Sequence, residues 1–258
     1  MAELVRSLTR GIAALQSFDA ATPRQTLSEV ARNIGLSRAT ARRMLITLAE
    51  LGFVSEADGV YELTPKVLEL GFAYLSSLTL TEVATPHLEA LSADVGESSS
   101  VSVLDDTEIV YVARVPVRRI MTASIGLGSR FPAFQTSMGR VLLADLDDRE
   151  AGRIYKKSDR SLVTEYTVKS EQELKAHLAE IRESGWALVD QEVVIGVRSI
   201  AAPLRNGSGK TVAAMNISTQ PHTTSMEELH GVLLPKLLAT AAKISASLVA
   251  HDARDLIP

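Results

Sequence analysis

The chain has 258 residues, 46% of them hydrophobic, and a formal net charge of −4. Such a hydrophobic content excludes a disordered chain, and the length allows one large domain or two of ordinary size. Because cysteine is absent, disulfide frameworks, thiolate metal sites and cysteine nucleophiles are excluded. The acidic net charge excludes a protein that is basic throughout, so nucleic acid could bind only to a local patch.

The first helix is predicted in "VRSLTRGIAALQSF", with Leu8, Ile12 and Leu15 as its core stripe. A second helix begins near Leu27, because Thr26 and Glu29 have the spacing of a capping box. Gly35 can take the left-handed conformation that ends this helix.

A third helix begins after Ser37, a good N-cap residue. Its inner stripe is Ala41, Leu45 and Leu48, and its arginines fall mostly outside that stripe. Between residues 23 and 48 five arginines face a single acid, Glu29. Two short helices joined by a tight turn, the second of them cationic, predict a helix-turn-helix.

A wing should follow, since short strands are expected at residues 53–55 and 60–63 around the turn signal Asp58-Gly59. Such a unit would read DNA with the start of its third helix. The residues predicted to contact DNA are Ser37, Arg38, Thr40, Arg42 and Arg43. The alternative is a small helical bundle whose arginine face is merely solvated.

The predicted domains are a winged helix-turn-helix at 1–65, a linker helix at 66–80 and a second domain at 81–258. The linker helix is too apolar to be a free connector. Its expected partner is its copy in a second subunit, because dimeric readers match two half-sites. Packing on its own domain is the alternative.

The second domain reads as α+β, with hairpin-like strand pairs in a mostly antiparallel sheet covered by helices. Strands are expected in "SSSVSVLDDTEIVYVARV", "RIMTASIGL", "GWALVDQEVV" and "SIAAPLRNGSGKTVAAMNIS". No continuous apolar run approaches the roughly 18 residues of a membrane span, and the chain start lacks a signal peptide pattern. We expect a cytoplasmic protein without a membrane partner.

Motifs for enzymatic chemistry are weak. "NGSGKT" lacks the first glycine of a P-loop, because Leu204 stands at that place, so Asn206-Gly207 predicts a hairpin turn. The five histidines show no metal-ligand spacing, and no GxSxG motif occurs. Asp190 and Glu192 could form an acid pair, but ordinary polar roles are favoured. We expect no catalytic residue, no metal and no cofactor.

Several segments together resemble the IclR family of bacterial transcriptional regulators. They are "RGIAALQSF", "LSEVARNIGLSRATARRMLITLAELGFV", "TSMGRVLLA" and "DQEVVIGVRSIAAPLRNGSGKTVAAMNIS". The resemblance implies a winged helix-turn-helix, a dimerising helical linker and a GAF-like or profilin-like effector-binding domain. It also implies homodimers that often pair as homotetramers on operator DNA. Residues 113–144 look most like the branch that regulates the β-ketoadipate pathway of aromatic-acid catabolism.

The resemblance also implies a ligand pocket between the sheet and the helix of the "SMGR" motif. The positions that match pocket residues are Ser137, Met138, Asp190, Ser199, Asn216 and Ser218. A small organic acid would also need a cation, for which the candidates are Arg119, Arg130 and Arg198, while Phe134 and Met121 could cover a ring.

Three alternatives stay open. The effector could be glyoxylate, pyruvate or a sugar acid, the second domain could be an enzyme that turns over its ligand, or the protein could bind DNA without an effector.

Overall fold

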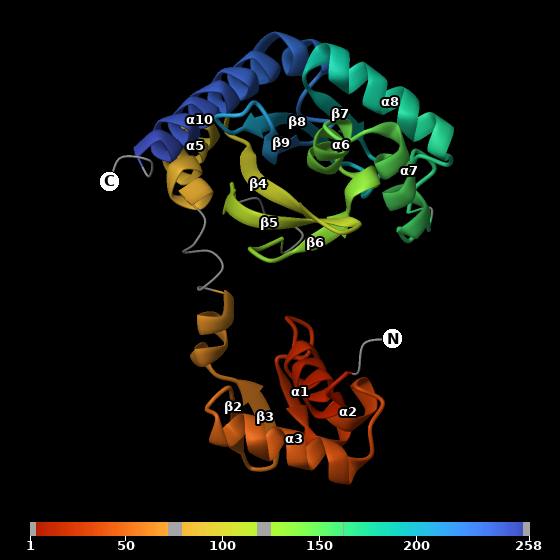
Figure 1. The fold of residues 1–258 in the computed structure, drawn as a ribbon, viewed down its shortest axis with the longest axis vertical. Helices are drawn as coiled ribbons and strands as arrows, with labels where there is room; N and C mark the ends of the chain where they lie inside the picture. Colours follow the sequence, from red (N-terminus) through yellow and green to blue (C-terminus); the bar gives the residue numbers. More distant parts are fainter. Residues whose placement is uncertain (1–3, 72–78, 118–124, 162, 255–258) are drawn as a thin grey trace. The chain divides into compact units, whose positions relative to one another are not determined.

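The structure is a computed structural model that describes residues 4–71, 79–117, 125–161 and 163–254. Its internal contacts divide the chain into two compact units, Met1–Ser77 and Leu78–Pro258 (Figure 1).

The N-terminal unit consists of three helices and a small sheet. Its helices are α1 (Arg6–Gln16), α2 (Leu27–Asn33) and α3 (Arg38–Glu50), and its strands are β1 (Arg24–Thr26), β2 (Val54–Ala57) and β3 (Val60–Leu63). The predicted capping box is present, because Thr26 N donates to Glu29 Oε2 at 2.7 Å and Glu29 N donates to Thr26 Oγ1 at 3.4 Å. Gly35 has a φ of 63°, as its place at the turn requires.

The wing is the antiparallel pair of β2 and β3. Asp58 and Gly59 join them with φ values of 53° and 77°, which is the backbone that a two-residue hairpin turn needs. The first wing strand begins at Val54, one residue later than expected, and β1 adds a third strand on the other side of β3, which the sequence did not predict.

The predicted core stripe of α1 is wrong at Leu8 and Ile12. Leu8 is 62% exposed and Ile12 is 48% exposed, whereas Ala14 and Phe18 are buried. Ala14 and Phe18 join Leu45 of α3 in the core of this unit, and Leu15 packs against that core while partly buried. The first helix therefore has a second apolar face that stays exposed among the described residues of its unit.

The predicted linker helix is described only in part. Residues 65–67 form the 3₁₀ turn η1, residues 68–71 are helical, and residues 72–78 of the predicted linker helix lie outside the described residues. Helix α5 (Thr79–Val95) follows and contains Pro86 in its interior.

The larger unit is built on a six-stranded sheet in the order β6-β5-β4-β9-β8-β7, in which all pairs are antiparallel. The strands are β4 (Ser98–Asp105), β5 (Glu108–Val115), β6 (Arg130–Pro132), β7 (Ala187–Asp190), β8 (Arg198–Arg205) and β9 (Thr211–Thr219). The mostly antiparallel α+β prediction is confirmed.

Helices cover both faces of this sheet (Figure 1). One layer is α5 with α10 (Leu234–Arg254), and the other is α6 (Ser137–Ala144), with α8 (Glu171–Ser184) packed against it and α7 (Asp148–Lys157) beside α8. A short 3₁₀ turn, η2 (Ala133–Gln135), leads from β6 into α6.

Two strand expectations differ from the structure. Residues 119–124 of the expected strand "RIMTASIGL" lie outside the described residues, and its last three residues are not a strand. Residues 191–194 form a loop after β7 rather than its continuation.

The last helical region consists of α9 (Met226–Glu228), the π-helical turn η3 (Leu229–Leu233) and α10. By length and composition, Met226–His251 is the one helix in the described part of the chain that could cross a membrane. Its buried side packs on β8 and α5 through Leu237, Ile244 and Leu248. Packing in the domain accounts for only part of this apolar composition, because 28% of the apolar window is buried.

Candidate functional site

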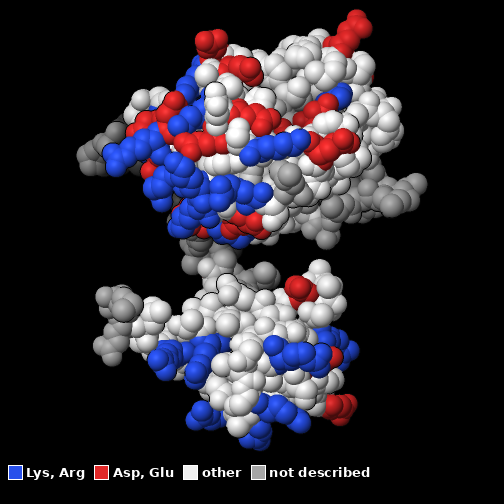
Figure 2. Space-filling model, turned by 90° about the vertical axis from the view of Figure 1, so that its right-hand side faces the viewer, with Lys and Arg blue, Asp and Glu red and all other residues white. Residues whose placement is uncertain are grey.

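The surface predicted to bind DNA is the start of α3. Arg38, Arg42 and Arg43 are exposed there, and none of them has an acidic partner among the described residues. On the face drawn in Figure 2, the charged side chains of the N-terminal unit are mostly basic, whereas the larger unit carries both signs. Unpaired guanidinium groups on an exposed helix are available to phosphates and base edges.

Ser37 and Thr40 also serve the helix itself. Thr40 N donates to Ser37 Oγ at 3.3 Å, and the two hydroxyl oxygens lie 3.0 Å apart. These hydroxyls fix where α3 begins, and so they orient the arginines that follow.

A cluster of polar side chains lies where the start of α6 meets the sheet. Ser137 Oγ and Ser199 Oγ are 2.8 Å apart, and Asn216 Nδ2 donates to Ser199 Oγ at 2.9 Å and to Ser218 Oγ at 3.0 Å. We call these four residues, Ser137, Ser199, Asn216 and Ser218, the hydroxyl cluster. The structure thus brings together four of the residues that the sequence assigned to a pocket, and Met138 lies beside them on α6 with 1% exposure.

The hydroxyl cluster holds an unused acceptor. Asn216 is 3% exposed, and its Oδ1 atom has no hydrogen-bond partner among the described residues. A buried polar atom without a partner costs free energy, and such atoms often mark the place of a ligand or water.

Sequence reasoning missed the residues of β4 and β5 beside this cluster. Ser100 pairs in register with Asn216 on one side and with Arg114 on the other, so the three lie in one row across β9, β4 and β5. Ser102 Oγ donates to Met138 Sδ at 3.3 Å, which places these β4 serines on the face that α6 covers. The row of serines in "SSSVSV" was the available signal.

Arg114 is a half-buried cation in this row. Its Nη1 donates to Ser100 Oγ at 3.1 Å, and its Nε is buried without a partner among the described residues. Burial lowers the pKa of the Arg114 guanidinium, and burial likewise raises the pKa of the neighbouring Tyr111 phenol, which the Arg114 charge lowers in part. The site therefore combines hydroxyls, an amide and a positive charge.

Asp190 and Arg198, two further predicted pocket residues, form an ion pair with each other. Arg198 Nη2 donates to Asp190 Oδ2 at 2.7 Å, and Arg198 Nη1 donates to the carbonyl of Thr224. Both are the strand neighbours of the paired residues Val189 and Ser199, and successive side chains of a strand point to opposite faces. Arg198 and Asp190, both predicted as pocket residues, therefore lie on the face opposite to Ser199, and the Arg198 charge is paired within the protein.

The remaining predicted pocket residues lie elsewhere. Arg130 bonds Glu108 at 2.8 Å and Asp105 at 2.7 Å on the exposed end of β6. Phe134 is 1% exposed in the core, where its ring packs edge-on against Tyr155. Arg130 thus has its charge paired within the protein and Phe134 lies in the core, while Arg119 and Met121 lie outside the described residues.

The other chemical motifs give no reaction centre. Glu192 pairs with the buried Arg140, so it does not form an acid pair with Asp190. Residues 206–210 are the hairpin loop between β8 and β9, as predicted, although the left-handed residue is Gly209 rather than Gly207. Among the described residues, no group of His, Cys, Asp and Glu could hold a metal ion.

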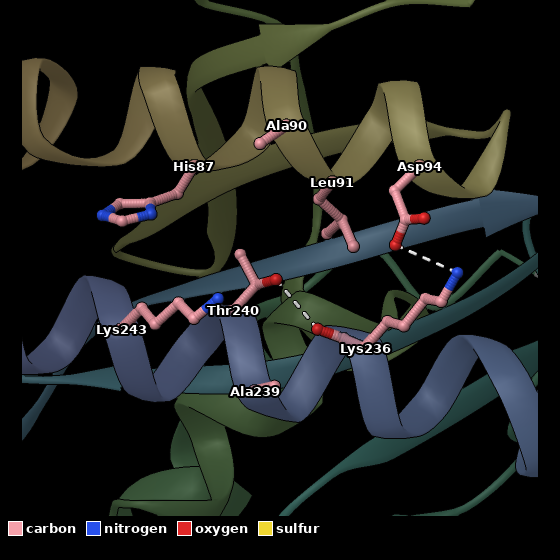
Figure 3. Close-up of a pocket in the computed structure, with 8 residues that line it drawn as sticks. All are labelled: His87, Ala90, Leu91, Asp94, Lys236, Ala239, Thr240 and Lys243. Carbon is pink, nitrogen blue, oxygen red and sulfur yellow. Dashed lines mark hydrogen bonds and ion pairs between the residues drawn. The ribbon is translucent and has the colours of Figure 1, made fainter.

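A separate groove of about 330 Å³ runs between α5 and α10 (Figure 3). In it Asp94 points toward Lys236, whose Nζ lies 3.0 Å from the Asp94 carboxylate. Its ionic groups are partly exposed and this pair is satisfied within the protein, so the groove lacks the unused buried atoms that distinguish the hydroxyl cluster.

Comparison with known families and proteins accounts for nearly the whole chain. Residues 7–58 match the IclR helix-turn-helix domain, and residues 72–246 match the family described as bacterial transcriptional regulator IclR C-terminal. The Pca regulon regulatory protein of Pseudomonas putida is 36% identical over 247 residues, an alignment that covers 95% of this chain and 85% of that protein.

Solved structures agree with this assignment. A transcriptional regulator from Rhodococcus sp. RHA1 has 54% sequence identity and a TM-score of 0.86, with 95% of this chain and 98% of that chain covered. The inducer-binding domain of the Acinetobacter transcription factor PobR, a double mutant in complex with 3-hydroxybenzoic acid, has 33% identity and a TM-score of 0.61, with 65% and 98% covered. The chain belongs to the IclR family and is a DNA-binding transcription regulator rather than an enzyme.

Proposed function

We propose that a small aromatic acid of the β-ketoadipate pathway binds at the hydroxyl cluster and controls how this regulator binds its operator. The observation that carries this proposal is the hydrogen-bonded group of Ser137, Ser199, Asn216 and Ser218. Ser137 and Asn216 are buried, and the Asn216 Oδ1 acceptor has no partner among the described residues. Buried polar groups of this kind orient a ligand and select it by hydrogen bonding.

Two relatives support the class of effector. The P. putida relative is named for the Pca regulon, and the PobR domain was solved with 3-hydroxybenzoic acid. The ligand of the PobR domain is an aromatic acid with a carboxylate and one hydroxyl group on a rigid ring.

We propose that DNA is read by the start of α3. The proposed contacts are Ser37, Arg38, Thr40, Arg42 and Arg43. The unpaired arginines would bind phosphates and base edges, and the Ser37 cap would fix their direction.

We also propose a cytoplasmic homodimer, or a homotetramer of two such dimers. Exposed apolar residues of the N-terminal unit support this assembly, because the described residues of that unit leave them open to solvent. They are Leu4, Val5, Leu8 and Ile12 at α1, together with Leu68 and Leu70 before α5. The proposed domain limits remain 1–65, 66–80 and 81–258, with the linker helix as the element through which ligand binding changes the arrangement of two DNA-binding units.

A thermal-shift screen tests the effector. The purified protein is heated with protocatechuate, 4-hydroxybenzoate, β-ketoadipate, glyoxylate or pyruvate, and its binding to the upstream intergenic DNA is then followed by gel shift. We expect an aromatic acid to raise Tm and to change the DNA complex. A rise with glyoxylate or pyruvate alone would contradict the aromatic class, and DNA binding without any shift would contradict an effector at the hydroxyl cluster.

A further inference from the structure

Arg114 differs from the other arginines that lie against the sheet of the larger unit. Arg130, Arg140 and Arg198 each have a carboxylate partner at hydrogen-bond distance. For Arg114 the described residues provide one hydroxyl bond, from Nη1 to Ser100, and no carboxylate.

A half-buried guanidinium without a nearby carboxylate lowers the stability of the folded protein. Removing a guanidinium from water without a counter-charge destabilises the folded protein, and a buried charge is normally paired. Burial already lowers the pKa of Arg114. A protein retains an unpaired, half-buried cation of this kind most readily where an anion arrives from outside.

The backbone directs Arg114 toward the ligand face. Ala113 pairs with Val101 and Arg114 with Ser100, but the register shifts at Val101/Ser102, so that Tyr111 pairs with Ser102 and Val112 is left over. This bulge places Tyr111 and Arg114, three positions apart, on the same face of the sheet. Without it, the strict alternation of a strand would turn one of them away.

We propose that Arg114 binds the carboxylate of the effector, with Ser100 beside it, while Asn216 Oδ1 accepts a hydrogen bond from a hydroxyl group at the other end of the same molecule. This proposal rests on the proposed function. It identifies the effector class as ring-containing hydroxy acids, because Arg114 and Asn216 lie in one row with β4 between them and a rigid ring can hold the two groups apart.

The start of α6 is the competing place for the carboxylate. A helix N-terminus carries about half a unit charge, whereas Arg114 carries a full one. The Ser137 hydroxyl at that helix start is also already bonded to Ser199. Both facts favour Arg114 as the carboxylate partner.

Calorimetric titration of the full-length protein tests the charge. The probes are 4-hydroxybenzoate and its uncharged analogue 4-hydroxybenzamide, and the proteins are the parent, Arg114→Met, Arg114→Lys and the control Arg130→Gln. We expect the parent to prefer the acid, and Arg114→Met to lose about 10-fold to 100-fold in affinity for the acid together with its preference over the amide. Arg114→Lys keeps the charge and should keep part of the preference, and Arg130→Gln should behave as the parent.

The hydroxyl end has its own test. Benzoate lacks the hydroxyl group, so the parent should bind it more weakly than 4-hydroxybenzoate, and Asn216→Ala should remove that difference. If Arg114→Met leaves both the affinity and the acid preference unchanged, Arg114 is not the anchor, although the proposed function stands. If the parent does not bind 4-hydroxybenzoate, the aromatic effector itself is contradicted.

Melting of the ligand-free proteins separates binding from folding. Because Arg114 is a half-buried cation to which the described residues offer no carboxylate, Arg114→Met should unfold at the same temperature as the parent or higher. A clear fall in Tm for both Arg114→Met and Arg114→Lys would show a structural role and would overturn the proposal.

Discussion

The hydroxyl oxygens of Ser137 and Ser199 lie 2.8 Å apart although 62 positions separate these residues in the chain. This bond joins the first residue of α6 to the second residue of β8. A molecule that inserts between the helix and the sheet must displace or extend it, so the position of α6 and ligand binding should be linked.

Replacing Ser137 by Leu should abolish the rise in Tm that an effector produces. Ser137 is 2% exposed, so the larger side chain fills the space that a ligand needs and removes the bond to Ser199. Melting curves with and without 4-hydroxybenzoate measure the effect, and Ser208→Ala in the β8–β9 loop is the control. Operator binding should survive in both variants, and an equal shift in Ser137→Leu and the parent would refute the assigned place of the ligand.

Replacing Arg43 by Ala should weaken operator binding by about 5-fold to 100-fold without unfolding the N-terminal unit. The residue is exposed on α3 and has no acidic partner among the residues described, so the change should remove only the proposed DNA contact. Gel-shift titration at two salt concentrations measures it. Arg149→Ala on α7 is the control, and an unchanged affinity for Arg43→Ala would contradict its role.

Replacing Gly139 by Ala should destabilise the larger unit by about 3 kcal/mol or more. An added Cβ would lie 2.0 Å from the carbonyl oxygen of Ala133, a backbone atom that cannot move without shifting η2. Gly231 has nothing within 4 Å of an added Cβ, so Gly231→Ala should be neutral or stabilising. Denaturant unfolding compares the two variants, and similar losses would show that the contact at Gly139 is easily relieved.

Asp145 gives the stability a specific pH dependence. Burial raises the pKa of its carboxyl, but hydrogen bonds from Thr211 and Arg205 outweigh that effect, so the pKa lies below its ordinary value of 3.8. A group with a lowered pKa stabilises the folded state above that ordinary value, and this stabilisation is lost as the pH falls through the lowered pKa.

Asp145→Asn should therefore lower Tm at pH 7, and the difference from the parent should shrink toward about pH 3. Melting curves at both pH values, with the exposed Glu183→Gln as control, measure it. A difference that stays constant with pH would show that hydrogen-bond geometry rather than charge is responsible.

The sequence predicted the DNA-binding unit best where local chemistry decides the backbone. The Thr26–Glu29 capping box, the Ser37 cap and the left-handed Gly35 each depend on residues within three or four positions. The sequence predicted α1 less well, because an apolar stripe can pack against its own unit or against another molecule, and the spacing of the residues is the same in both cases. Leu8 and Ile12 have helical spacing and yet are exposed.

For the larger unit, the sequence predicted the members of the hydroxyl cluster through a family resemblance but not the cation beside it. The place of Arg114 could not be predicted, because one extra residue in β5 changes which side chains of that strand share a face of the sheet. Arg198 was an unsuitable candidate because its partner Asp190 comes from the adjacent strand, and strand pairing is not visible in a single sequence.

The hydroxyl cluster contains only serine hydroxyls and one carboxamide, groups that carry no titrating proton over the pH range in which proteins stay folded. A guanidinium such as that of Arg114 does not lose its proton in proteins either. Affinity for an acid bound among these residues should therefore follow the ionisation of the acid alone. If the internal pH of a cell changes, the affinity of the protein for the ionised acid should stay the same until the acid itself becomes protonated.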